Sequence, residues 1–139
     1  MKNNPSPKDL IATGAQFAYP SSWPRWEVIN IQCIQFNYKI GVEIGVNNGE
    51  NMFSLLDKGN KKLKMYGVDP YKVQPDNTLY ESVKTDINCW TPIVQEDGLI
   101  MGHDYNWGNV ARAVGEIFTE VWIFPDNIWA ASKVWLRND

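Results

Sequence analysis

Apolar residues follow two different spacings along the chain, and the changes between the spacings mark the expected elements. Where apolar residues recur every third or fourth position the pattern predicts an amphipathic helix, and where they form a short unbroken run it predicts a buried strand. The helical spacing predicts a short helix from Ser6 that ends before Tyr19, followed by helices at Pro24 to Asn37, Glu50 to Lys58, Asp76 to Val94 and Asn109 to Phe118.

Short apolar runs predict strands between these helices. They lie at Ile40 to Val46, Leu63 to Val68 and Leu99 to Met101, and two further runs close the chain at Val121 to Phe124 and Ile128 to Leu136. Strands that alternate with helices indicate an α/β fold with a mostly parallel sheet. The turn residues Pro125-Asp126-Asn127 separate the last two runs, which are therefore expected to form an antiparallel hairpin at one edge.

The chain is 139 residues long, which is enough for one domain around a single hydrophobic core. No internal repeat, low-complexity tract or linker interrupts the alternation of helices and strands. We therefore expect one minimal domain over residues 1–139, in which residues 1–37 form N-terminal helices and residues 38–139 form the α/β core. The apolar stripe of the fourth expected helix should belong to that core; its members are Tyr80, Val83, Ile87, Trp90 and Val94.

The composition describes a soluble chain and excludes some classes of partner. Apolar residues make up 44% of the sequence, charged residues 21%, and no window is apolar enough for a membrane span. The net charge is −3, without a basic stripe, which argues against a nucleic acid as the main partner. The first ten residues carry no apolar signal segment, so we expect a cytoplasmic protein.

The two cysteines, Cys33 and Cys89, belong to no metal-binding or redox motif. Both lie in helical apolar patterns, which indicates buried, reduced thiols in a cytosolic protein. The chain also carries seven Trp, six Tyr and five Phe, a large aromatic content for this length. Some of these rings are expected at a subunit interface.

The carboxyl end of the first expected strand is the place where open α/β sheets bind ligands. It carries Glu43-x-Gly45-x-x-x-Gly49, and Asp69 ends the second strand. Gly45 allows a tight turn and a close approach of ligand to backbone, and Gly49 opens the following helix. An acid at the position of Asp69 can accept hydrogen bonds from both ribose hydroxyls of a nucleoside.

A dinucleotide and S-adenosylmethionine (SAM) both fit a glycine turn followed by a ribose-binding acid. A dinucleotide needs the denser G-x-G-x-x-G turn and a helix N-terminus open to phosphate, whereas here Glu50 begins the helix. SAM has no phosphate, and its ammonium group favours an acidic neighbour such as Glu43. The residues therefore favour SAM over a dinucleotide, and an ordinary strand-to-helix turn without a ligand is the third reading.

Five landmarks follow one another in a familiar order. They are Val42-Glu43-Ile44-Gly45-x-x-x-Gly49, Gly67-Val68-Asp69-Pro70-Tyr71, Tyr80-Glu81-Ser82-Val83-Lys84-x-Asp86-Ile87, Asp97-Gly98-Leu99-Ile100-Met101-Gly102-His103-Asp104-Tyr105 and Val110-x-x-Ala113-Val114-x-Glu116-Ile117-Phe118. Together they resemble a subgroup of the class I SAM-dependent methyltransferases, over roughly residues 38 to 136. The resemblance implies a three-layer, Rossmann-like SAM-methyltransferase fold and methyl transfer, often to oxygen atoms of sugars or small molecules.

The sequence departs from that subgroup between its second and third landmarks. Relatives of this kind carry about fifty residues there, including the third and fourth strands, whereas here only about ten residues separate Asp69 from Tyr80, and Thr78 replaces the usual His. The resemblance thus implies a reduced sheet of about five strands, ordered 2-1-5-7-6 in the parent's numbering. Its first strand must pair with the strand before His103 or be completed by another subunit.

Loss of those strands has two expected consequences. The adenine loses one wall of its pocket, so SAM should bind more weakly or be covered by another segment, such as Tyr71–Asn77. Apolar faces left without cover usually mark an interface, which predicts a homo-oligomer, most simply a dimer.

His103 is the only histidine of the chain, and with Asp104 it follows the third expected strand. A histidine can take the proton of a hydroxyl near neutral pH, which makes His103 the candidate base. By resemblance Asp104 is a candidate ligand for a divalent cation, and Glu81 is the acid that could replace the missing second ligand. The alternative is a structural pair that holds the turn after the strand.

The leading hypothesis is a minimal SAM-dependent O-methyltransferase acting on a small molecule or sugar. A second hypothesis is a non-catalytic SAM-binding or scaffold protein that retains a truncated methyltransferase fold. A nucleotide- or dinucleotide-binding enzyme is weaker because the glycine pattern fits it poorly.

Overall fold

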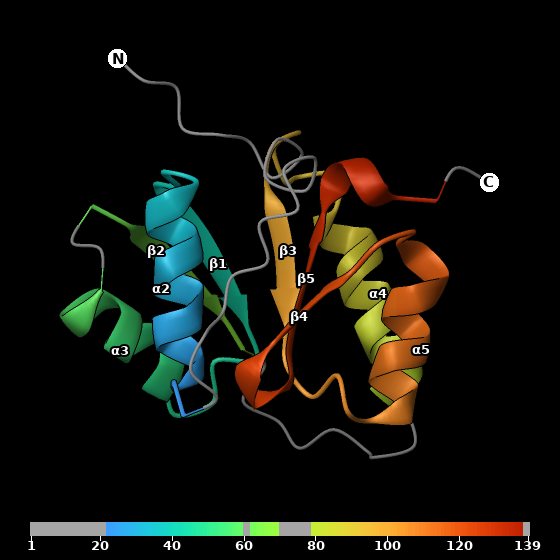
Figure 1. Ribbon diagram of the computed structural model, residues 1–139, viewed down its shortest axis with the longest axis horizontal. Coiled ribbons are helices and arrows are strands. Elements are labelled where there is room, and N and C mark those ends of the chain that lie inside the picture. Colours follow the sequence, from blue (N-terminus) through green and yellow to red (C-terminus); the bar gives the residue numbers. More distant parts are fainter. Residues whose placement is uncertain (1–21, 60–61, 70–78, 138–139) are drawn as a thin grey trace. The chain divides into compact units, whose positions relative to one another are not determined.

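The computed structural model of the chain describes residues 22–59, 62–69 and 79–137 (Figure 1). The helix expected from Ser6, the helix start at Asp76 and the covering segment Tyr71–Asn77 lie outside these residues. The chain divides into two compact units, Met1–Val73 and Gln74–Asp139, and each is described by itself.

Unit 1 is built from two helices and a parallel pair of strands. Its elements are α2 (Arg25–Gln35), β1 (Ile40–Ile44), α3 (Glu50–Lys58) and β2 (Lys64–Val68). The strands pair from Ile40 opposite Lys64 to Ile44 opposite Val68. Helix α3 packs against α2 and β2, and the fully buried side chains of Val28 and Leu55 lie in this small core.

One face of the β1–β2 pair is open to solvent. Alternate residues of β1 are exposed, with Ile40 64% and Val42 42% accessible, while Gly41 and Glu43 are half-buried. Tyr66 and Val68 of β2 and Ile44 of β1 are exposed as well. The prediction of a buried strand is therefore wrong for this face of β1: no second helical layer covers it within the described part of unit 1.

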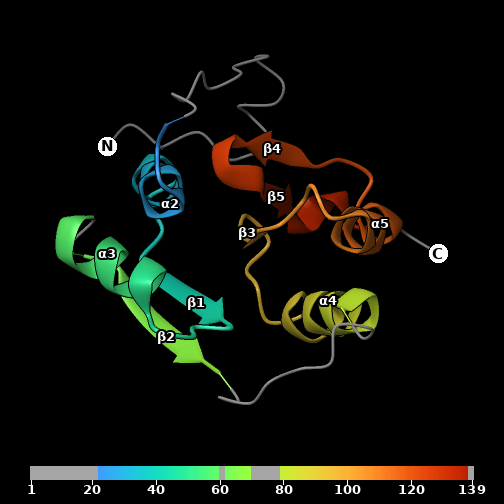
Figure 2. The same cartoon turned by 90° about the horizontal axis from the view of Figure 1, so that it is seen from below.

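Unit 2 contains an antiparallel sheet and two helices. Its elements are α4 (Leu79–Trp90), β3 (Leu99–Gly102), α5 (Gly108–Ile117), β4 (Trp122–Phe124) and β5 (Ile128–Ser132), with short 3₁₀ turns at Pro125–Asn127 and Lys133–Trp135. Strand β5 lies between β3 and β4 and is buried at every residue. Helices α4 and α5 lie side by side (Figure 2).

The core of unit 2 lies between β5 and α5. Its buried residues include Val110, Ala113, Val114, Phe118, Trp129, Ala130 and Ala131. Gly102, at the end of β3, belongs to this packing because a Cβ there would overlap the indole ring of Trp129. The close approach of Trp129 to β3 thus accounts for the glycine just before His103.

The mixed α/β class and the closing hairpin β4–β5 are confirmed, but one continuous five-stranded sheet is not found. The described strands form two sheets, β1–β2 and β3–β5–β4. Each sheet keeps the order expected from the resemblance.

Two boundaries also differ from the sequence pattern. Helix α4 ends at Trp90 because Pro92 cannot continue it, and the hydroxyl of Thr91 donates a 2.6 Å hydrogen bond to the carbonyl of Ile87. Of the expected apolar stripe only Ile87 is buried, and its other members are half-buried. The last strand ends at Ser132 and not at Leu136.

In the described part of the chain, no helix has both the length and the apolar character needed to cross a membrane.

Candidate functional site

The turn between β1 and α3 has the left-handed backbone that its glycines predict. Gly45, Asn47 and Gly49 have φ angles of 75°, 50° and 76°. Two hydrogen bonds fix the turn: the Gly45 amide donates to the carbonyl of Val68 at 2.9 Å, and the Gly49 amide donates to that of Val46 at 2.8 Å. Because α3 begins directly after Gly49, the backbone here runs from strand to helix through one tight turn.

Gly45 faces open space. A Cβ built on it would meet no other atom within 4 Å, so the backbone is accessible at this residue. A substitution here would therefore be opposed by the positive φ and not by a clash with the protein. This is the arrangement expected where a ligand lies directly against the main chain.

Asp69 directly follows β2 and contacts the turn after β1. Its Oδ2 accepts a 2.6 Å hydrogen bond from the amide of Asn47, which joins the end of β2 to the turn after β1. The sequence named Asp69 as a candidate but not Asn47. The Asn47-Asn48-Gly49 turn was the available signal, since asparagine tolerates the left-handed conformation better than other non-glycine residues.

Glu43 lies on the face of β1 that the helices cover. Its side chain is hydrogen-bonded to Asn51 of α3 and feels the charge of Arg25 of α2. Burial raises the pKa of the Glu43 carboxyl above its usual value, and these two partners act in the opposite direction. Its Oε2 is buried and has no hydrogen-bond partner among the described residues. Glu43 and Asp69 thus flank the same strand–turn–helix segment.

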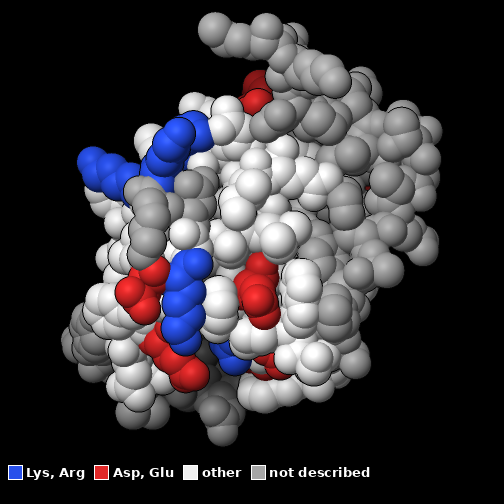
Figure 3. Space-filling view, turned by 60° about the vertical axis from the view of Figure 1, so that its left-hand side comes forward, with Lys and Arg blue, Asp and Glu red and all other residues white. Residues whose placement is uncertain are grey.

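The charges around this turn suit a cation better than a phosphate. Glu43 and Asp69 flank the turn, and Glu50 occupies the first position of α3, where a phosphate would meet the amide groups of the helix. On the face shown in Figure 3, basic and acidic side chains alternate without forming one large patch of a single sign. The residues present therefore give the turn an acidic neighbourhood.

In unit 2, His103 lies between two carboxylates. It follows β3, and its Nδ1 is 2.7 Å from Oδ1 of Asp104, while its Nε2 is 3.6 Å from Oδ2 of Asp126. Asp104 and Asp126 both have a left-handed backbone, with φ angles of 60° and 59°. The sequence predicted His103 and Asp104 together. It missed Asp126, for which the Pro125-Asp126-Asn127 turn was the only signal.

The contact between Nδ1 of His103 and Asp104 affects which ring nitrogen carries the proton. When Nδ1 carries the proton and donates it to Asp104, Nε2 is left as a hydrogen-bond acceptor. Nε2 is buried and has no hydrogen-bond partner among the described residues. The ring of His103 is thus oriented by Asp104 on one side, and its other nitrogen faces Asp126.

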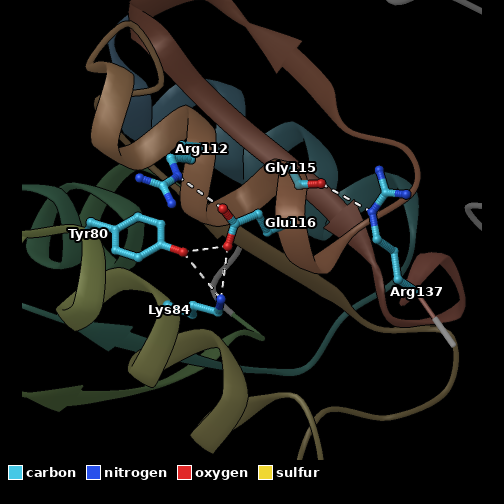
Figure 4. A network of polar contacts seen from close by, with 6 residues as sticks. All are labelled: Tyr80, Lys84, Arg112, Gly115, Glu116 and Arg137. Carbon is cyan, nitrogen blue, oxygen red and sulfur yellow. Dashed lines mark hydrogen bonds and ion pairs between the residues drawn. The ribbon is translucent and has the colours of Figure 1, made fainter. Parts of the chain in front are cut away.

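The third and fifth landmark motifs meet in a network between α4 and α5 (Figure 4). Glu116 accepts hydrogen bonds from the hydroxyl of Tyr80, from Nζ of Lys84 at 2.8 Å and from Nε of Arg112 at 3.0 Å. The two cations also lie over the ring of Tyr80, 5.5 and 4.5 Å from its centroid. These donors lower the pKa of Glu116 to about 2. The network gives these motif residues a structural role.

The metal candidates Asp104 and Glu81 lie on different elements of unit 2. Asp104 follows β3 and is engaged by His103, while Glu81 is an exposed residue in the first turn of α4. The described ranges contain no group of three or more His, Cys, Asp or Glu side chains that could hold a metal ion.

The two cysteines differ in exposure. Both thiols are free, as expected, and Cys33 is buried in α2. Burial raises the pKa of the Cys33 thiol to about 11. Cys89 on α4 is exposed, so the prediction that both thiols are buried is wrong for Cys89. The apolar stripe of α4 runs along a different side of the helix.

No protein-family model matches the chain, and comparisons with curated proteins and with solved structures give no match either. The side chains described above are therefore the basis for assigning a function.

Proposed function

We propose that this protein is a Rossmann-like, SAM-dependent methyltransferase that methylates a hydroxyl group of a small molecule or sugar. The observation that supports this most directly is the turn after β1: Gly45 is open and left-handed, and Asp69 is hydrogen-bonded to the same turn. A nucleoside that lies against this backbone could reach the Asp69 carboxylate with its ribose hydroxyls.

Each unit has its own part in the proposal. SAM, when bound, supplies a methyl group on a positively charged sulfur. In unit 1, Gly45 leaves the main chain bare for the ligand, Gly49 gives the turn its left-handed backbone under the ring of Phe53, Asp69 binds the ribose, and Glu43 provides negative charge for the ammonium group. In unit 2, His103 removes the proton of the acceptor hydroxyl, and Asp104 keeps the imidazole in the tautomer that can do so.

The alternative is a non-catalytic SAM-binding or scaffold protein. The division of the strands between two sheets favours it, because the central strands of the parent fold carry part of the adenine pocket. Turnover separates the two proposals. A scaffold binds SAM and transfers no methyl group to any acceptor.

We further propose a homodimer that uses the exposed face of β1 and β2. Five apolar side chains of this face are accessible: Ile40, Val42, Ile44, Tyr66 and Val68. Contiguous apolar surface of this kind is typical of protein interfaces. Light scattering should give the mass of a dimer for the wild type and of a monomer for a Val42→Asp variant; a monomeric wild type contradicts the proposal.

The free state of both thiols fits a cytoplasmic location.

Ligand binding is the first test of the function. S-adenosylhomocysteine should raise the melting temperature, since a ligand at a hundredfold excess over its Kd stabilises the folded state by about 2.7 kcal/mol. NAD at the same concentration should have little effect. Stabilisation by NAD alone would exclude the SAM proposal.

Methyl transfer is the second test. Labelled SAM should transfer its methyl group to one member of a panel of sugars and phenols. A His103→Ala variant should keep its affinity for S-adenosylhomocysteine and lose the transfer. Binding without transfer by the wild type would select the scaffold alternative.

A further inference from the structure

Phe53 is an exposed aromatic side chain near the start of α3. It is 61% accessible, whereas Leu55 of the same helix is buried in the core of unit 1. Met52 faces β2, since a Cβ built on Gly67 would lie 3.3 Å from the sulfur of Met52. Phe53 therefore points away from the core, and core packing in the described part of unit 1 does not account for an aromatic ring here.

The ring of Phe53 lies on the backbone of Gly49. A Cβ built on Gly49 would overlap the carbons at one edge of this ring. The amide of Phe53 donates a 2.8 Å hydrogen bond to the carbonyl of Gly49, and helical side chains lean toward the N-terminus of their helix, which brings the ring over the turn. The turn thus holds the ring on one side, while most of the side chain is open to solvent.

The same strand–turn–helix segment carries the two groups proposed to bind a nucleoside. Gly45 has open space around it, and Asp69 accepts the hydrogen bond from the amide of Asn47. A carboxylate can accept hydrogen bonds from ribose hydroxyls, and an aromatic side chain can stack on a base. One short segment therefore offers a group for each part of a nucleoside.

We propose that Phe53 stacks against the base of a purine nucleoside bound at the turn after β1. Every base has a flat aromatic face, and stacking on an exposed ring needs no enclosing cavity. The resemblance implied that adenine loses one wall of its pocket, and Phe53 supplies an aromatic surface in its place. This inference rests on the nucleoside site proposed above, but not on methyl transfer.

The charges at the turn restrict the ligand to a nucleoside without phosphate. Glu50 is the first residue of α3, and Asp69 contacts the turn from the end of β2. The two carboxylates repel a phosphate group. Adenosine should therefore bind more tightly than its 5′-monophosphate. SAM and S-adenosylhomocysteine carry no phosphate and meet the same requirement.

The test compares adenosine with uridine, which has the same ribose and a smaller ring. The full chain with isotope-labelled phenylalanine is titrated with each nucleoside, without SAM, and followed by NMR and calorimetry. The signal of Phe53 is identified by its loss in the Phe53→Ala variant. Adenosine should shift this signal and bind about tenfold more tightly than uridine, which is within the range of base–aromatic stacking.

Three variants complete the test. Phe53→Ala should lose the preference for adenosine, whereas Phe53→Tyr keeps the ring and should retain it. Ile34→Ala removes an exposed apolar side chain from α2 of the same unit and should behave as the wild type. A Phe53 signal that adenosine does not shift, or a preference that persists in Phe53→Ala, would overturn the inference.

S-adenosylhomocysteine separates this inference from the proposed function. If the wild type and Phe53→Ala bind it equally well, Phe53 has no part in binding and the SAM proposal stands. If adenosine shifts the Phe53 signal and S-adenosylhomocysteine does not bind, the stacking role stands and the SAM proposal fails.

Discussion

The amide of Asn47 donates a 2.6 Å hydrogen bond to Oδ2 of Asp69, and this bond links two residues that are 22 positions apart in the chain. It connects the turn after β1 to the end of β2, directly beside the paired residues Ile44 and Val68. The acid expected to bind a ribose therefore already supports the turn that would receive the nucleoside.

Asp69→Ala should lower both stability and ligand affinity. The loss of one exposed hydrogen bond to a carboxylate is expected to cost about 1 kcal/mol of unfolding free energy. Asp69→Asn retains an acceptor oxygen for the Asn47 amide, so it should be more stable than Asp69→Ala while still binding S-adenosylhomocysteine weakly. Chemical denaturation and calorimetry measure the two effects. Equal stability of all three proteins would show that the bond has no structural value.

Gly45→Ala should destabilise the chain by about 1 kcal/mol because alanine disfavours its left-handed backbone. Since a Cβ at this position has open space around it, no clash with the protein adds to this cost. Affinity for S-adenosylhomocysteine should fall further than stability does. The matched control is Gly115→Ala in α5, which also has open space but a helical backbone, and should gain about 0.5–1 kcal/mol. A neutral effect at residue 45 would contradict the assigned turn.

Glu116→Gln should destabilise the protein in a pH-dependent way. The pKa of Glu116 is lowered from 4.5 to about 2 in the folded chain, so its ionised form favours folding. That contribution is complete above pH 4.5 and is lost as the pH falls toward 2. The difference in melting temperature between wild type and variant should therefore shrink over this range. Glu120→Gln provides the control, for which we expect no comparable trend.

Asp104→Asn should fold and yet change the state of His103. Asparagine tolerates the left-handed φ of 60°, and its amide no longer fixes the proton on Nδ1. NMR of the imidazole nitrogens should show a mixture of tautomers, and methyl transfer should fall about a hundredfold. An unchanged tautomer would mean that other contacts orient the ring.

The two thiols should react at very different rates. The exposed Cys89 should be modified by a thiol reagent in the native protein, whereas Cys33, buried and with a pKa of about 11, should react only after unfolding. Cys89→Ser should therefore remove the native reaction, and Cys33→Ser should leave it unchanged. Fast modification of both thiols would show that α2 opens readily.

The local elements could be predicted from the sequence because their signals are local. Helix α3 begins and ends where Glu50 and Gly59 predicted, and the turn glycines have the backbone that their residue type favours. The exposure of one face of β1 could not be predicted in this way. Burial depends on contacts between distant segments, and a buried strand and a half-exposed one share the same apolar run.

The candidate site shows the same division. His103 and Asp104 are neighbours in sequence, so their contact could be predicted. Asp126 reaches the ring from another turn, and Asn51 reaches Glu43 from the next helix. Nothing in the spacing of these residues indicates that they meet, because only the folded backbone brings them together.

The uncovered side of β1 has a practical consequence for work with fragments. Among the described strands, β1 pairs only with β2, so its other edge is unpaired. Ile40, Val42 and Ile44 are exposed on one face of β1. A short, apolar strand with an unpaired edge is a template on which further strands can assemble. A fragment that ends near Val73 would therefore be prone to precipitate as β-rich aggregates, and a lysine in place of Val42 would act as a gatekeeper against this.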